Sequence, residues 1–145
     1  MDFPREAQDI MNQRFGCDRV IALATEADGK PFVRNVNSYY ENGAFYTITD
    51  VRTNKMQQIQ RNPTVAIAGE WFTAHGTGEN MGHILLEGNR EIADKLRTVF
   101  AEWYGNGHIN EADPNTSILC IHLTDGVLFS HGTRYDIDFT MDGCL

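Results

Sequence analysis

The sequence predicts a mainly β protein, a β-barrel of six or seven largely antiparallel strands with about three peripheral helices. Strand-like segments follow one another and are separated by short turn signals, "EADGK" and "ENGA". Three segments with apolar residues at helical spacing lie between or beside these strands. Antiparallel meanders of this size commonly close into a barrel, because closure removes the exposed edges of the sheet.

The first 50 residues predict one helix and three strands. Pro4 is a favoured first residue of a helix, and Gly16 ends this helix. The strands are expected where apolar and aromatic residues gather between the turn signals. Their expected bounds are Val20–Thr25, Pro31–Tyr39 and Ala44–Thr49.

A short helix and further strands are expected in the middle of the chain. Thr53 is a good N-cap for the helix, and Pro63 stops it. One or two strands follow within residues 64–78, bent or broken near Gly69.

The second half predicts the clearest helix and the last two strands. The helix is capped by Asn89 and closed by Gly105, and it carries one apolar face. After a polar loop over residues 106–116, the strands "SILCIHLT" and "VLFSHGT" are expected on either side of a turn at Asp125 and Gly126.

Length and composition predict one domain covering residues 1–145 and a cytoplasmic protein. The chain is long enough to bury a core, and 41% of its residues are hydrophobic. Twelve basic and 20 acidic residues give a net charge of −8, so nucleic acid is not an expected partner. No apolar stretch approaches the roughly 20 residues of a membrane span, and the N-terminus lacks the pattern of a secretory signal. We therefore expect no membrane association.

The cysteines and histidines predict neither a disulfide framework nor a metal site. Cys17, Cys120 and Cys144 are odd in number and form no CxxC pair, so we interpret them as reduced thiols. The histidines show no HxxxH or HxH spacing, so zinc is not expected. His75 and His131 lie in glycine-rich stretches, where each could be a proton donor to a ligand or a hydrogen-bonded loop residue.

The start of the short helix carries an unusual charge. A helix N-terminus bears about half a positive charge, which favours acids nearby, yet Arg52 and Lys55 flank Thr53. A bound phosphate would pair with the free backbone N–H groups and with the side chains of Thr53, Asn54 and Lys55. Arg34 in the second strand could reach the same place. The alternative is that Lys55 is an ordinary surface lysine.

The middle of the chain resembles the pyridoxamine 5'-phosphate oxidase-like family, whose members adopt the FMN-binding split barrel. The matching run is "KPFVRNVNSYYENGAFYTITDVRTNKMQQIQRNPTVAIAG". Three features carry the resemblance: Arg-x-Val at residues 34–36, a strand ending in Thr49, and Thr-x-Lys at residues 53–55 before a short helix ending in "RNP". The match covers residues 18 to about 75, and the order of the later elements fits. The resemblance implies a homodimer with FMN at the two-fold interface.

The resemblance also implies roles for individual residues in a flavin site. The residues that would hold the FMN phosphate are Arg34, Thr53, Asn54 and Lys55; the oxidases proper carry Arg at the position of Asn54. The residues that would lie along the ribityl chain or the ring edge are Thr47 and Thr49. The residues that would face the isoalloxazine are Asn37 and Ser38. Trp71 is either a contact from the second subunit or a core residue.

The end of the chain departs from the true oxidases. Phe129 stands where they carry Trp, and Arg134 stands where an Arg meets a phosphate-bearing substrate. The rest of their Arg-Leu-His-Asp-Arg pattern is replaced by "RYDID", and Tyr39 replaces a flavin-contacting Lys. We therefore expect a substrate other than a B6 vitamer.

These observations favour an FMN-dependent oxidoreductase that passes electrons from a reduced nicotinamide to a small oxidant. The cofactor would carry the chemistry and the protein would position it, so no catalytic side chain is assigned. One alternative is a non-catalytic carrier or a redox or stress sensor, which could hold heme or a deazaflavin in place of FMN. Another is a barrel that has lost its cofactor and acts through dimerisation alone.

Overall fold

A computed structural model describes residues 2–140 of the chain; Cys144 lies outside the described residues. The helices are α1 (Arg5–Phe15), α2 (Asn54–Arg61), α3 (Arg90–Val99) and α4 (Ala101–Tyr104), with a 3-10 turn, η1 (Glu87–Asn89), before α3. The strands are β1 (Arg19–Ala27), β2 (Lys30–Glu41), β3 (Ala44–Asp50), β4 (Thr64–Gly69), β5 (Phe72–His83), β6 (Thr116–Ser130) and β7 (Thr133–Asp138). None of the described helices has the length and apolar character needed to cross a membrane.

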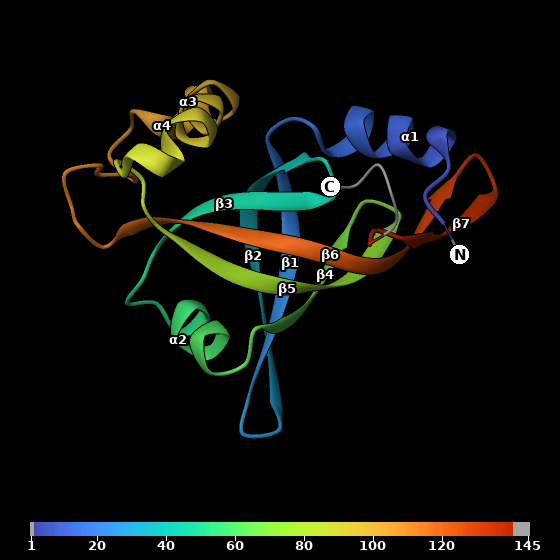
Figure 1. Ribbon diagram of the computed structural model, residues 1–145, viewed down its shortest axis with the longest axis horizontal. Coiled ribbons are helices and arrows are strands. Elements are labelled where there is room, and N and C mark those ends of the chain that lie inside the picture. Colours follow the sequence, from blue (N-terminus) through green and yellow to red (C-terminus); the bar gives the residue numbers. More distant parts are fainter. Residues whose placement is uncertain (1, 141–145) are drawn as a thin grey trace.

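Six of the strands close into an antiparallel barrel (Figure 1). The strand order is β3-β2-β1-β4-β5-β6, and β3 pairs with β6 to complete the ring, while β7 extends β6 on its other side. This closure gives the β3 and β6 edges backbone partners. The structure confirms the predicted mainly β barrel of the split-barrel type, and its likeness to solved members of this fold supports the same architecture.

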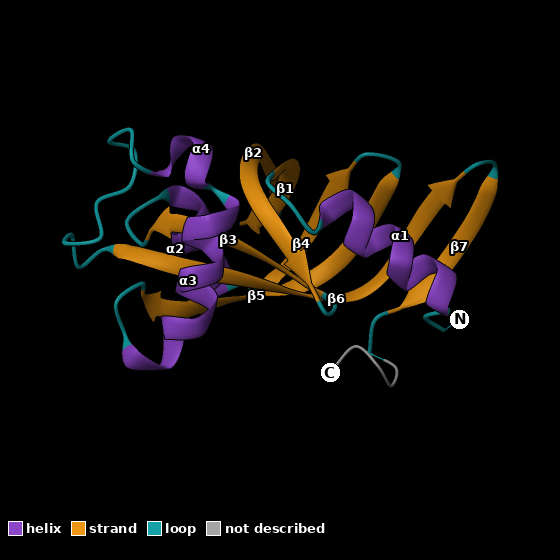
Figure 2. Ribbon diagram, turned by 90° about the horizontal axis from the view of Figure 1, so that it is seen from above, coloured by secondary structure: helices purple, strands orange, loops and turns teal. Residues whose placement is uncertain are grey.

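The barrel interior is packed with aromatic and aliphatic side chains. Phe15 of α1 makes an edge contact with Phe45 of β3 and a tilted contact with Phe72 of β5, with ring centroids 5.5 Å apart in both pairs. These contacts tie the first helix to the barrel core, and α1 lies beside β7 at the opposite end of the molecule from α3 and α4 (Figure 2). A second cluster forms where Leu96 and Phe100 pack on Ile118 of β6.

Two expected boundaries are wrong. No turn occurs at Asp125 and Gly126, because β6 runs through them, and Gly126 lies where a Cβ would come within 3.0 Å of Phe139. The last hairpin turn is instead at His131 and Gly132, whose φ angles of 49° and 79° fit a type I′ turn. The long helix expected after Asn89 is also divided, because the backbone leaves helical geometry at Phe100 and separates α3 from α4.

A substitution at Gly76 tests how closely the backbones of β5 and β6 approach each other. A Cβ added at Gly76 would lie 2.7 Å from the carbonyl oxygen of His122, a backbone atom that cannot turn away. We expect Gly76→Ala to lower the free energy of unfolding by about 1–3 kcal/mol, measured by urea denaturation. Gly105→Ala is the control, since a Cβ there meets no atom within 4 Å, and it should change stability by less than about 0.5 kcal/mol. Equal effects in both variants would contradict this account.

Candidate functional site

The first turn of α2 presents free backbone donors. Thr53 stands at the N-cap position, but its hydroxyl donates to the carbonyl oxygen of Asp50 at 2.8 Å and does not cap the helix. Asn54 is the exposed first residue of α2, and no acidic residue lies in the first turn. The N–H groups at this end of α2 therefore remain available to an anion.

Lys55 is a half-buried cation beside this helix end. Burial lowers the pKa of Lys55, and the positive charge of Arg34 lowers it further, while Asp50 acts weakly in the opposite direction. Among residues 2–140, no carboxylate forms an ion pair with Lys55. Its position is therefore unfavourable for a cation unless a negative group is present.

Arg34 approaches the same helix from the barrel side. Its guanidinium donates to the carbonyl oxygen of Leu23 at 3.1 Å and to the Thr25 hydroxyl at 2.8 Å. A third hydrogen bond of 3.3 Å reaches Gln58 Oε1 on α2. Burial lowers the pKa of Arg34, and no carboxylate in the described part of the chain is paired with it. Arg34 and Lys55 thus form a pair of neighbouring cations without an acidic partner.

A pocket of about 210 Å³ lies next to Lys55 and contains several of the predicted site residues. Lys55, Asn37 and Thr47 come from three different elements and line it together. Thr49 follows Thr47 on the same face of β3, and its buried hydroxyl oxygen has no hydrogen-bond partner among the described residues. A buried hydroxyl without a partner is uncommon, so the structure has an unused polar group on this face.

One wall of the pocket was not expected from the sequence. The remaining lining residues are Val36, Ile48, Trp103, His108 and Ile109. Trp103 lies within the helix that the sequence predicts between Asn89 and Gly105, and residues 106–116 are predicted only as a polar loop. Nothing in the local sequence of this loop indicates that it returns to β3, because that position depends on contacts with distant residues.

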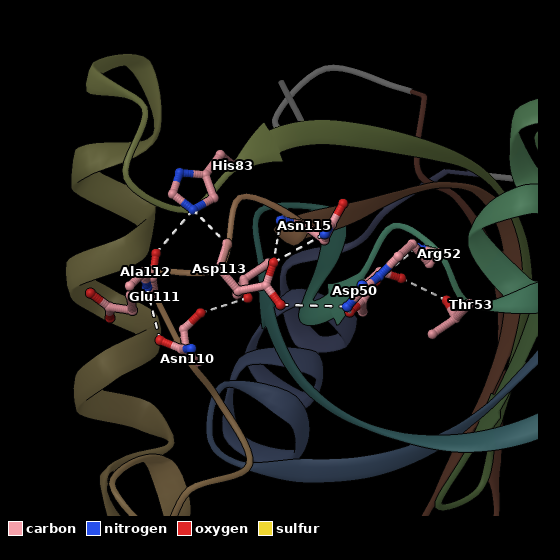
Figure 3. Close-up of polar contacts among 10 residues, drawn as sticks. Asp50, Arg52, Thr53, His83, Asn110, Glu111, Ala112, Asp113 and Asn115 are labelled. Carbon is pink, nitrogen blue, oxygen red and sulfur yellow. Dashed lines mark hydrogen bonds and ion pairs between the residues drawn. The ribbon is translucent and has the colours of Figure 1, made fainter.

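Figure 3 shows the polar contacts that hold this loop in place. His83 Nε2 donates to the carbonyl oxygens of Glu111 and Asp113, each 3.0 Å away, so the loop is held to the end of β5. Arg52 holds the same loop from the other side: its guanidinium lies 2.6 Å from Asp50 Oδ2 and 3.4 Å from Asp113 Oδ2. Carboxylates of the chain itself therefore neutralise the positive charge of Arg52. Of the two basic residues that flank Thr53, Lys55 is the one without an acidic partner among the described residues.

Several predicted residues lie outside the pocket. Ser38 is fully buried and donates to the carbonyl oxygen of Arg19 at 3.0 Å. Trp71 stands in the β4–β5 turn and is 72% exposed, so its interpretation as a core residue is wrong. Arg134 on β7 pairs with Asp136 at 2.9 Å. None of these side chains lines the pocket beside Lys55.

The two histidines considered as proton donors also lie away from this pocket. His75 Nδ1 is 2.9 Å from Asp125 Oδ1 on the neighbouring strand. His131 stands in the β6–β7 turn and faces a separate hollow shared with Trp71 and Phe129. The histidine that does line the pocket is His108.

Comparison with known proteins agrees with this architecture. The family model for pyridoxamine 5'-phosphate oxidase matches residues 6–128. General stress protein 26 of Bacillus subtilis (strain 168) is 26% identical over 144 residues, which is 97% of each chain. An FAD-binding protein from Mesorhizobium loti superimposes with a TM-score of 0.65 and 18% identity over 83% of this chain and 89% of its own. A heme binding protein from Mycobacterium smegmatis has a TM-score of 0.65 and 14% identity over 84% of this chain and 53% of its own.

The class defined by the fold is a closed antiparallel split barrel in which a short helix follows the third strand. The family match covers most of the length of the chain. The chain belongs to the pyridoxamine 5'-phosphate oxidase family, as the resemblance in the middle of its sequence implied. The solved structures share the fold at low sequence identity.

Arg52→Ala tests the ion pair between Arg52 and Asp50 in the turn before α2. The Arg52 side chain, followed by its backbone N–H, lowers the pKa of Asp50 to about 2. A lowered pKa stabilises the folded state above the ordinary value of 3.8, and this contribution is lost as pH falls from 3.8 to about 2. In the variant the pKa of Asp50 should rise toward 3.8, measured by NMR titration, and the loss of stability over this pH range should shrink.

Arg61→Ala is the matched control for this experiment. Arg61 is an exposed residue at the other end of α2, and no acidic residue in the described ranges forms an ion pair with it. The Asp50 titration should be unchanged in this variant. An unchanged titration in Arg52→Ala as well would show that the ion pair does not control Asp50.

Proposed function

We propose that this chain binds FMN, with the flavin phosphate at the start of α2. The observation that carries the proposal is the convergence of Lys55 and Arg34 without a carboxylate partner, beside backbone N–H groups that no side chain caps. A phosphate dianion supplies the charge and the acceptor oxygens that these groups lack. Thr53 and Asn54 at the same helix end would add contacts to the phosphate.

The pocket next to Lys55 fits the rest of such a ligand in its polarity. Asn37 and Thr47 would offer an amide and a hydroxyl to the ribityl chain or the ring edge. The unpartnered hydroxyl of Thr49 on the same strand face would find an acceptor or donor in a bound polar group. Ser38, engaged with β1, would contribute through the position of its strand backbone.

We further propose that two copies form a homodimer that completes the site. On the outer face of β1 and β2, Val20 is 57% exposed and Val33 is 70% exposed, and Val20 stands opposite Asn37 in the ladder. Burial of these side chains against a second copy would be favourable and would place that copy next to the pocket. Trp71 and Arg134, which lie away from the pocket of their own chain, would then act from the partner.

The activity that we propose is that of an oxidoreductase. When bound, the flavin supplies the redox chemistry, which is the passage of electrons from a reduced nicotinamide to a small oxidant. The chain supplies the anchor for the phosphate, and the wall formed by Trp103 and Ile109 excludes water from one side of the pocket. The substrate is a small molecule other than a B6 vitamer, because the end of the chain departs from the true oxidases.

A second candidate is a binding protein without turnover, a carrier or a redox or stress sensor. One observation favours it: the side chains of His75 and Asp125 are paired with each other on the barrel surface and do not line the pocket. The fold also occurs in a heme binding protein, so heme is an alternative ligand. Deazaflavin is a further alternative that the family resemblance allows. A barrel that acts through dimerisation alone would bind none of them.

The absorbance spectrum of the purified protein tests the cofactor. After excess FMN and desalting, we expect the two visible bands of oxidised flavin. Lys55→Ala should weaken FMN binding about 10- to 100-fold, because a charged hydrogen bond contributes about 1.5–3 kcal/mol. A fluorescence titration measures the affinity.

Lys30→Ala is the control for this experiment, because Lys30 is an exposed lysine at the β1–β2 turn. It should bind FMN as tightly as the unaltered chain. A protein that cannot be reconstituted with FMN would overturn the flavin proposal, and a heme Soret band would replace it with heme. If Lys55→Ala and Lys30→Ala bind FMN with equal affinity, the flavin phosphate does not bind at the start of α2.

Turnover distinguishes the oxidoreductase from the carrier. The FMN-loaded protein should oxidise a reduced nicotinamide in the presence of a small electron acceptor faster than the same concentration of free FMN. The Lys55→Ala variant should lose activity in proportion to its lost cofactor, since Lys55 anchors the phosphate. Retained flavin with a rate no higher than that of free FMN would favour the carrier or sensor.

A further inference from the structure

Three potential metal ligands meet on the outer face of the barrel wall, apart from the residues that line the pocket beside Lys55; two of them are exposed and the third, Cys120, is buried. Cys120 and His122 stand two positions apart on β6, so both point away from the core occupied by Leu119 and Ile121. Glu79 of β5 lies directly opposite Cys120 in the ladder. One donor atom from each side chain lies within 4.8 Å of the other two.

The three side chains of this cluster lie close enough together to approach one ion. His122 Nδ1 is 3.9 Å from Cys120 Sγ, and His122 Nε2 is 2.7 Å from Glu79 Oε1. Donor atoms around a tetrahedral zinc ion, with bonds of about 2.0–2.3 Å, are roughly 3.3–3.7 Å apart. The two distances involve different ring nitrogens of His122, and one ion takes only one of them. Binding of an ion therefore requires the exposed side chains of Glu79 and His122 to turn, so that one nitrogen and one carboxylate oxygen take that spacing from the Cys120 thiol.

We propose that Glu79, Cys120 and His122 bind one Zn²⁺ ion that bridges β5 and β6. Thiolate sulfur, imidazole nitrogen and carboxylate oxygen are the three donor types that zinc takes in proteins. The carboxylate and the thiolate would together neutralise the charge of the ion, and the net charge of −8 favours cation binding by this chain. Three protein ligands leave a fourth position for water.

Cys120 holds its sulfur in a buried position on β6, between Tyr46 of β3 and Glu79 of β5. The side chain is 1% exposed, so the sulfur has a fixed place in the cluster. Tyr46 lies opposite Cys120 on the other neighbouring strand, so the thiol is covered on that side. Binding of the ion would release the thiol proton to solvent, so the metal would replace a proton.

A second histidine–carboxylate pair on β5 and β6 can be compared with the proposed zinc ligands. His75 of β5 pairs with Asp125 of β6 at 2.9 Å, so it is a histidine–carboxylate pair of the same kind on the same ladder. No cysteine among residues 2–140 joins that pair in a three-ligand group. Only the pair next to Cys120 should therefore hold a thiophilic ion.

Metal titration of the full-length chain tests the proposal. We expect one Zn²⁺ per chain by isothermal titration calorimetry. Co²⁺ in its place should give a thiolate-to-metal charge-transfer band in the near ultraviolet. His122→Gln and Glu79→Gln, which change exposed side chains, should each weaken Zn²⁺ binding more than about ten-fold. Cys120→Ser should abolish the cobalt band.

Variants outside the cluster are the controls. His75→Gln should bind Zn²⁺ as the unaltered chain does, and so should Cys17→Ser and Cys144→Ser, which remove the other two thiols of the sequence. Circular dichroism of each variant checks that the fold is kept. The proposal is overturned if the cobalt band is absent in the unaltered chain, if it persists in Cys120→Ser, or if His75→Gln weakens binding as much as His122→Gln does.

Discussion

The pairing of β3 with β6 is the interaction on which the rest of the structure depends. It extends from Ala44 opposite His122 to Asp50 opposite Thr116, and it joins parts of the chain that are far apart in sequence. Without it the strands would form an open sheet with β3 as an exposed edge. Because the pairing ends at Asp50 and Thr116, the turn into α2 lies beside the loop that precedes β6. Because these two segments lie close together, they form the pocket beside Lys55, and Asp113 lies next to Arg52.

Barrel closure gives the cations near α2 two different environments. Arg52 is exposed and lies between two carboxylates, whereas Lys55 and Arg34 are partly buried next to one another. Removing a positive charge from water without a partner costs free energy, and a second positive charge nearby increases that cost. A bound anion would offset both the cost of burying these charges and the repulsion between them. The electrostatic cost in the free chain and the affinity proposed for phosphate therefore have the same origin.

The side chains of β6 alternate between the barrel core and the outer face of the barrel. Leu119 and Ile121 pack inside, while Cys120 and His122 face outward. Alternation can be inferred from the sequence, but the partner strand and its register cannot. The position of Glu79 beside Cys120 is set by the β5–β6 ladder. For this reason, the spacing of cysteines and histidines in the sequence did not indicate the cluster.

Local sequence was sufficient for most strands, for α1 and α2, and for the phosphate-binding hypothesis. Hairpin signals, caps and the consecutive residues Thr53, Asn54 and Lys55 act over a few positions, so their physical effect can be inferred without the fold. Only the folded chain decided that β6 continues through Gly126, that the helix breaks at Phe100 and that the loop 106–116 reaches the pocket. Each of these depends on packing or hydrogen bonds between residues distant in sequence, and local patterns contain no record of such contacts.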